Sequence, residues 1–284
     1  MNRISISQAW AYTTSFFSNQ MASHAIVLIA VGIAVPTLLQ LMFGGTAAMD
    51  PATLASGANS MAAFGLLAGV LAIVGFIIQL ASYYASWRIG FDPGRETVGS
   101  ALQYGFIAAL PVMLVTIGFI LIVGVVFGVL FGSAMLPILM GGGAPTDGAA
   151  LQTLGMMGLA VPVFLVFGLW LSARLCVMGP VMAASRSFNP LTALAESWRM
   201  TAASQWKLMG YFVLLTIVFI ILAMILGMVF GLSLLAGGQP GAASIIVATI
   251  LSALISIPVA YLYVGIPAGI YRALGGDQAG DVFA

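Results

Sequence analysis

The stretch that decides the fold is RLCVMGPVMAASRSFNPLTALAESWRMTAASQWK, residues 174–207. It joins two strongly apolar segments and carries four of the eight Lys and Arg residues of the chain: Arg174, Arg186, Arg199 and Lys207. In its middle, Asn189 followed by Pro190 is typical of a helix N-cap with proline at the first helical position. We therefore expect a short amphipathic helix at the membrane surface between two membrane-spanning helices.

The composition of the whole chain indicates a membrane protein. Of its 284 residues, 62% are hydrophobic and only 5% are charged, whereas a soluble domain carries about 25% charged residues. The net charge of +1 gives no reason to expect a nucleic-acid partner. The single cysteine, Cys176, and the single histidine, His24, exclude an internal disulfide, a multi-cysteine metal site and a histidine pair. We expect no cofactor and no metal.

Six apolar runs reach the roughly 20 residues that a helix needs to cross a bilayer. They lie at about 21–43, 61–87, 105–132, 153–174, 207–236 and 242–271, and the third is preceded by a mildly amphipathic segment at 97–104 that we expect to be interfacial. Backbone polar groups in hydrocarbon must be satisfied internally, so runs of this length are helices. The predicted fold is therefore all-α: one membrane domain over residues 1–284 with six transmembrane helices, amphipathic interfacial helices and a short mobile tail at 274–284.

The loop charges predict the orientation of these spans. Seven Lys and Arg residues fall in the N-terminus, the 88–101 and 179–207 segments and the C-terminus, and the other three loops hold none. Because positive charges are retained on the cytoplasmic side, both termini are predicted to be cytoplasmic. An even number of crossings agrees with this orientation.

Three similar span ends suggest a threefold repeat with units at about 1–90, 91–188 and 189–273. Arg88 precedes Asp92-Pro93, Arg186 precedes Asn189-Pro190, and Arg272 precedes Asp277. Each unit would consist of an interfacial helix, a span, an outer loop and a second span. At the N-terminus, Ile6, Trp10, Phe16 and Phe17 could share one face of the first interfacial helix.

This sequence resembles the membrane domain of glycerophosphoryl diester phosphodiesterase membrane-domain proteins and the related YciC-like inner-membrane family. The resemblance is carried by Arg174, Gly179-Pro180, Asn189-Pro190, the ALAESWRMT helix and Trp206-Lys207. It implies a multi-pass protein of the bacterial inner membrane with a role in membrane or envelope homeostasis. In some members this region is joined to a soluble catalytic barrel, which no segment of this chain could form.

Arg174 is the most informative candidate site residue. It comes 21 residues after Thr153, or roughly 31 Å along a helix, which places it near the cytoplasmic edge of the membrane core. One interpretation is a cation that binds an anionic lipid headgroup or pairs with Glu196 and so docks the interfacial helix. The other is an arginine whose side chain extends to the interface.

Two further groups of residues allow more than one interpretation. Arg199 and Lys207, with Arg186, could attract anionic lipid or a protein partner, although the topology rule alone accounts for their charge. The glycines Gly65, Gly69, Gly124, Gly128 and Gly132 put small residues on helical faces, where packing within the chain is favoured over a dimer interface.

Catalysis is not expected from these residues. The only histidine lies at the start of the first span, no Ser motif accompanies it, and every Asp lies in a loop or the tail. We therefore expect a non-catalytic membrane protein that acts through lipid or protein contacts. The alternative is a permease for a lipid or small apolar solute. Prolines within the spans favour this alternative, and it predicts a polar cavity near Gln40, Gln79 and Arg174.

Overall fold

A computed structural model describes residues 4–18, 20–43, 58–139, 147–235 and 242–276. These residues form helices and turns, with no strand among them. Six of the helices are long and apolar enough to cross a membrane, so this is a multi-pass membrane protein and the predicted all-α class is confirmed. Residues 44–57, 140–146, 236–241 and 277–284 lie outside the described residues, and with them parts of the predicted loops and most of the predicted tail.

The first repeat unit of the prediction corresponds to the helices before residue 92. They are α1 (Ile6–Ser18), α2 (Met21–Ala25), the π-helix η1 (Ile26–Ala34), α3 (Val35–Phe43) and α5 (Ala58–Phe91). Helices α2, η1 and α3 follow one another as one continuous span. The π-helical part ends just before Pro36, which cannot donate a backbone hydrogen bond to the preceding turn.

The rest of the chain contains the other four spans. The helices are α6 (Val98–Leu139), α7 (Asp147–Leu175), α8 (Met178–Ser185), α9 (Pro190–Thr201), the 3₁₀ turn η3 (Ala202–Ser204), α10 (Gln205–Leu235) and α11 (Ala242–Ala273). The expected interfacial segment at 97–104 is not a separate helix, because it is continuous with the 42-residue α6. By contrast, α1 ends at Ser18 before the first span begins, and α9 is divided from α10 by the 3₁₀ turn η3. The threefold repeat itself stays a prediction.

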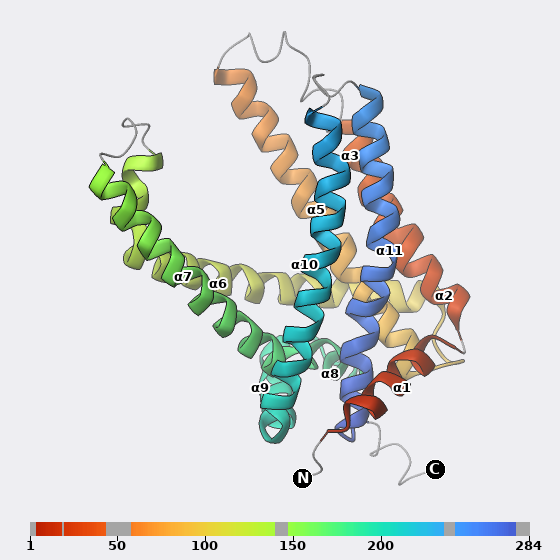
Figure 1. The fold of residues 1–284 in the computed structure, drawn as a ribbon. Helices are drawn as coiled ribbons and strands as arrows, with labels where there is room; N and C mark the ends of the chain where they lie inside the picture. The colour runs from red at the N-terminus through yellow and green to blue at the C-terminus, as the bar shows by residue number, and fades with distance from the viewer. Residues whose placement is uncertain (1–3, 19, 44–57, 140–146, 236–241, 277–284) are drawn as a thin grey trace.

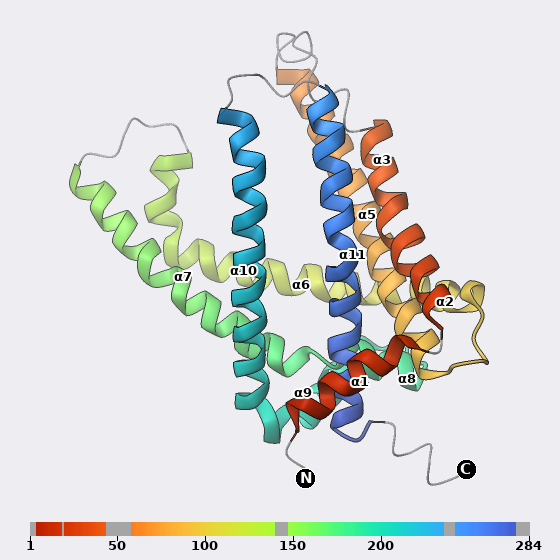
Figure 2. The ribbon, with the colours of Figure 1, turned by 45° about the vertical axis from the view of Figure 1, so that its right-hand side comes forward.

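The helices are arranged as an upright group and a divergent hairpin (Figure 1). Helices α3, α5, α10 and α11 run upright, while α6 lies across them and then turns upward to meet α7. The view turned by 45° shows the α6–α7 hairpin again standing apart from the upright group (Figure 2). The tightly packed core therefore lies at the end of the molecule where α1, α8 and α9 gather.

Small residues allow the closest helix crossings. Gly105 of α6 lies against the backbone of Ala81 in α5, where a Cβ atom would collide with the Ala81 carbonyl. Gly269 of α11 lies equally close to the Ala9 carbonyl of α1, and the Thr13 hydroxyl donates to the Gly265 carbonyl at 3.1 Å. Because glycine has no side chain, the two backbones can come into direct contact at such crossings. Close contact of this kind stabilises helix association in lipid.

Three of the five glycines that sequence analysis favoured for packing have open space around them. Gly69, Gly124 and Gly128 have no heavy atom within 4 Å of an added Cβ atom. Gly65 and Gly132 lie where side-chain surroundings are not described. The expectation of packing within the chain at Gly69, Gly124 and Gly128 is therefore wrong. Gly124 and Gly128 lie where α6 has diverged from the upright helices, and Gly69 lies on a part of α5 that no neighbouring helix approaches closely.

Candidate functional site

Four charged residues form a cluster at the end of α5, which we call the turn cluster: Arg88, Asp92, Glu96 and Arg186. The Arg88 side chain is 3% exposed. Its Nη2 donates to Asp92 Oδ2 at 2.8 Å, its Nε to Glu96 Oε1 at 2.8 Å, and its Nη1 to the Ala183 carbonyl at 2.9 Å. Since two carboxylates and a carbonyl satisfy the guanidinium, the cost of burying this charge is offset.

Arg186 completes the turn cluster from the C-terminal end of α8. Its Nη2 lies 2.9 Å from both Asp92 Oδ2 and Glu96 Oε1. Arg186 adopts a left-handed backbone with φ of 52°, and the following amide of Ser187 donates to the Met182 carbonyl at 3.1 Å. Helices usually end this way on glycine, because a side chain costs about 1–2 kcal/mol in that conformation. The arginine is thus placed at a strained position from which it reaches both carboxylates.

The turn cluster also determines the ionisation of Glu96. Its burial raises the pKa of the carboxyl, but hydrogen bonds from Ser100 and Arg88 and the charges of Arg88 and Arg186 lower it further. The net effect is a pKa below the ordinary value of 4.5. The carboxylate therefore stays ionised at neutral pH and holds the loop between α5 and α6 against the end of α8.

Two aromatic side chains and Arg272 add further contacts between the helices around the turn cluster. Tyr104 of α6 donates from its hydroxyl to the Met182 carbonyl at 2.8 Å, and Trp87 donates from Nε1 to the Val264 carbonyl of α11 at 2.8 Å. Arg272, near the end of α11, donates to the Gly90 carbonyl of α5 at 3.1 Å. The span ends that resemble one another in sequence thus come together in space.

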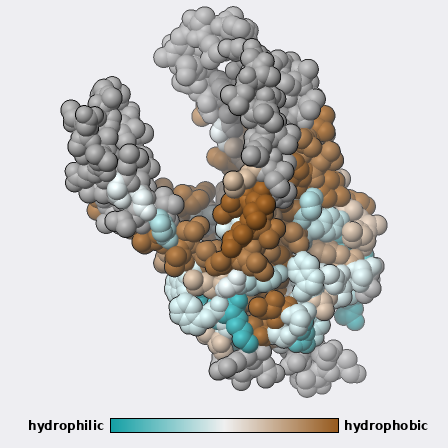
Figure 3. Space-filling model, viewed as in Figure 1, coloured by the Kyte–Doolittle hydropathy of each residue, from teal (hydrophilic) through white to brown (hydrophobic). Residues whose placement is uncertain are grey.

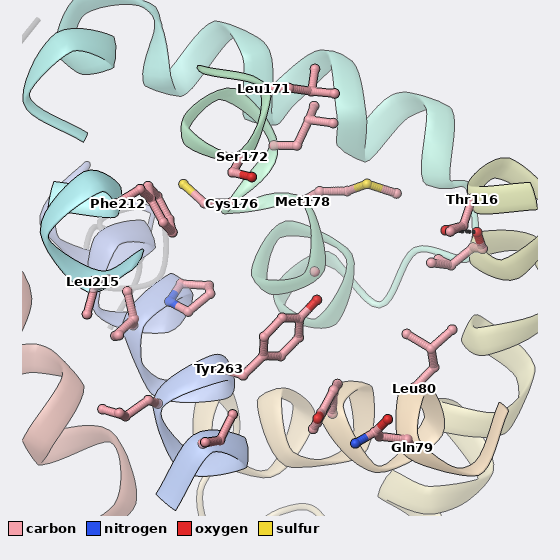
Figure 4. A pocket seen from close by; sticks show the side chains of 18 of the residues that line it. Gln79, Leu80, Thr116, Leu171, Ser172, Cys176, Met178, Phe212, Leu215 and Tyr263 are labelled. Carbon is pink, nitrogen blue, oxygen red and sulfur yellow. Dashed lines mark hydrogen bonds between the residues drawn. The ribbon is translucent and has the colours of Figure 1, made fainter. Parts of the chain in front are cut away.

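A chamber of about 890 Å³ lies next to the turn cluster and these helix contacts. Side chains of α5, α6, α7, α8, α10 and α11 line it, and most of them are apolar. Tyr263 of α11 points toward its middle, with Gln79 and Leu80 of α5 on one side and, on the other, Ser172 of α7 and Cys176, which directly follows α7 (Figure 4). The molecule is hollowed between the α6–α7 hairpin and α5, and hydrophobic side chains lie at the base of the hollow (Figure 3).

The few polar side chains of the chamber are uncharged. Gln79 and Tyr83 lie one turn apart on α5, so both project from the same face. The Tyr83 ring lies 4.7 Å from the ring of Tyr263, whose side chain is 55% exposed. No Asp, Glu, Lys, Arg or His is among the described residues that line the chamber. It can accept an apolar molecule and hydrogen-bond one neutral polar group.

Arg174 contacts the interfacial helix α9 but does not pair with Glu196 as expected. Its Nη1 donates to the Trp198 carbonyl at 3.2 Å, and its guanidinium lies 4.5 Å from the centre of the Trp198 ring. Glu196 instead pairs with Arg199 at 2.7 Å, three residues along the same helix. The hypothesised pair of Arg174 with Glu196 is not formed, because Trp198 faces α7 and Glu196 pairs with Arg199 along α9.

Helix α9 is held to α7 chiefly by hydroxyl groups. Ser197 and Thr201 both donate to the Arg174 carbonyl, at 2.8 and 3.2 Å. Lys207 is exposed and reaches the Ile4 carbonyl at 3.4 Å. The buried Nε of Arg174 has no hydrogen-bond partner among the described residues. Lipid contact at Arg174, Arg199 and Lys207 stays a prediction.

Other predicted positions are separated by the fold. The chamber contains Gln79 but neither Gln40 nor Arg174, so the three residues of the permease hypothesis do not share one cavity. On α1, Phe16 is buried while Ile6 and Trp10 are exposed, at 41% and 47%, so these residues do not share the packed face. His24 is fully buried, and its Nδ1 lies 2.7 Å from the Ser86 hydroxyl. The described residues contain no group of three His, Cys, Asp or Glu side chains that could hold a metal.

Comparison with known proteins agrees with this architecture. Residues 146–270 match the family described as the membrane domain of glycerophosphoryl diester phosphodiesterase. The match runs from α7 to the last turns of α11 and confirms the predicted resemblance to this membrane-domain family. No match was found among curated proteins or among solved structures.

Sequence reasoning missed two parts of the site. The importance of Arg88 was not foreseen, although the repeated Arg before Asp-Pro or Asn-Pro pointed to it. The chamber was foreseen only through Gln79 in the permease alternative, because its other lining residues are ordinary apolar and small polar residues spread over six helices. Only their arrangement in space distinguishes them.

Proposed function

We propose that this protein is a non-catalytic, multi-pass protein of the bacterial inner membrane that binds a lipid molecule in the chamber. The observation that supports this function is an uncharged cavity of about 890 Å³ among membrane-spanning helices. Small-molecule sites of about 300–1,000 Å³ with a few polar groups are typical of ligand pockets. Because hydrocarbon surrounds the spans, lipid is the most abundant molecule available to fill it.

The same proposal places both termini in the cytoplasm. Arg88, Arg186, Arg272 and Lys207 all lie near one end of the helices, and so do Ile4 and Gly276, the first and last described residues. The excess of positive charge at this end supports a cytoplasmic location. The turn cluster would then lie at the cytoplasmic surface, with the chamber just beneath it.

The test is native mass spectrometry of the protein extracted with its own lipids. Gly168 lines the chamber and has no heavy atom within 4 Å of an added Cβ, so Gly168→Phe is the substitution chosen to place a large side chain there. Gly210 of α10 is equally open but does not line the chamber, so Gly210→Phe is the matched control. We expect a lipid that wild type and Gly210→Phe retain and Gly168→Phe loses. Equal retention in all three would reject the proposed function.

Arg174→Gln belongs in the same measurement. If an anionic lipid is lost from this variant while the chamber lipid remains, Arg174 binds a headgroup separately from the chamber. Unchanged lipid profiles would leave Arg174 as a residue that holds α9.

A permease for a lipid or small apolar solute is the second candidate. The hollow between the α6–α7 hairpin and α5 favours it, since a solute that enters from the bilayer could reach the chamber there. Lipid exchange between the leaflets of reconstituted vesicles would distinguish a permease from a protein that only binds its lipid.

A further inference from the structure

We infer that the ligand of the chamber is a neutral lipid: a long-chain ester, amide or alcohol without a phosphate or other charged headgroup. This inference rests on the proposed function and specifies its ligand. It is drawn from two features of the lining, the absence of charged side chains and the grouping of three uncharged polar ones.

The first feature disfavours a charged ligand. No Lys, Arg or His is among the described residues that line the chamber. A phosphate inside it would lose its hydration without gaining a cation, and burial of an unpaired charge is strongly unfavourable. The arginines of the neighbouring turn cluster do not change this, because Arg88 and Arg186 are already bound to Asp92 and Glu96.

The second feature favours a ligand with one neutral polar group. The Gln79 amide can donate and accept, and the Tyr83 and Tyr263 hydroxyls can do the same. Tyr83 and Tyr263 approach each other from α5 and α11, and Tyr263 points into the chamber. A carbonyl or hydroxyl of a lipid could hydrogen-bond this group while its chains lie against the apolar lining. The Gln79 amide and the Tyr83 hydroxyl already hydrogen-bond each other, and a lipid carbonyl or hydroxyl could use their remaining donors and acceptors, which a pure hydrocarbon could not.

Two probes with the same chains separate the alternatives. Dioleoylglycerol is uncharged, and dioleoylphosphatidate differs from it only by its phosphate. Each is titrated into the detergent-solubilised protein, and the apparent Kd is measured by native mass spectrometry. Only binding that Gly168→Phe abolishes is assigned to the chamber, since phosphatidate can also bind the exposed cations.

The variants remove hydrogen bonds at nearly constant side-chain volume. Gln79→Leu and Tyr263→Phe alter the chamber, and Tyr261→Phe makes the same change on α11 outside the chamber lining. We expect dioleoylglycerol to bind the chamber at least about tenfold more tightly than dioleoylphosphatidate. Gln79→Leu or Tyr263→Phe should weaken it about tenfold, the effect of one lost hydrogen bond, while Tyr261→Phe should not.

The outcomes distinguish this inference from the proposed function. Chamber-dependent binding of phosphatidate as tight as that of dioleoylglycerol would overturn the neutral-lipid inference and leave the chamber as a lipid site. Dioleoylglycerol binding that is insensitive to Gln79→Leu and Tyr263→Phe would also overturn it. If Gly168→Phe affects neither lipid, both the inference and the proposed function fail.

Discussion

Among single residues, Arg88 and Arg186 bind the same two carboxylates in very different surroundings. Arg88 is buried and also holds the Ala183 carbonyl, whereas the Arg186 side chain is 60% exposed. Loss of one partner of a buried ion pair costs about 3–5 kcal/mol, whereas an exposed pair contributes about 0–1 kcal/mol. The two arginines should therefore differ strongly in their effect on stability.

We predict that Arg88→Gln lowers the stability by about 3–5 kcal/mol, because Asp92 and Glu96 lose their buried partner. Arg186→Gly should stay within about 1 kcal/mol of wild type, since glycine relieves the left-handed backbone while the exposed ion pairs are lost. Thermal unfolding in detergent measures both variants. Equal shifts in Tm would contradict the assignment of Arg88 as the central residue of the turn cluster.

The lowered pKa of Glu96 predicts that the stability of the protein depends on pH. A carboxyl whose folded-state pKa is depressed stabilises the fold above its ordinary pKa of 4.5. This contribution disappears as the pH falls from 4.5 through the folded-state value. We expect the difference in Tm between wild type and Glu96→Gln to be largest at neutral pH and to shrink toward pH 3.5. A constant difference over this range would show that the Glu96 charge is not responsible.

Helix packing in this molecule depends on which glycines face a neighbouring backbone. Gly269 lies against the Ala9 carbonyl of α1, whereas Gly210 on α10 has open space around it. Gly269→Ala should separate α1 from α11 and cost about 1–3 kcal/mol, because a Cβ atom cannot be accommodated there. Gly210→Ala should be neutral or stabilising by up to about 1 kcal/mol, since alanine favours a helix.

Limited proteolysis of α1, together with Tm, would test the prediction for Gly269. Gly269→Ala should speed cleavage within α1, and Gly210→Ala should leave the rate unchanged. Normal protection of α1 in Gly269→Ala would mean that α1 is held by other contacts, such as the hydrogen bond of Lys207 to the Ile4 carbonyl.

Over the whole molecule, the charged end should face the cytoplasm. In a Cys176→Ser background, Ala203→Cys places a single thiol at an exposed position of that end, and Asp147→Cys places one at the start of α7. Neither substitution removes a Lys or Arg. We expect a membrane-impermeant maleimide to label Asp147→Cys in intact spheroplasts and Ala203→Cys only after the membrane is opened. The reverse pattern would invert the proposed orientation.

The sequence by itself determined the class, the number of spans and the N-cap at Asn189, whose side chain accepts hydrogen bonds from the amides of Leu191 and Thr192. These features are local, because a helix in lipid satisfies its own backbone and its apolar length is read directly from the chain. The tertiary structure decided the partners of Arg88 and Arg174, the glycines that pack and the chamber. Each of these depends on which helix faces meet, and residues as far apart as Arg88 and Ala183 come together only after the spans have packed.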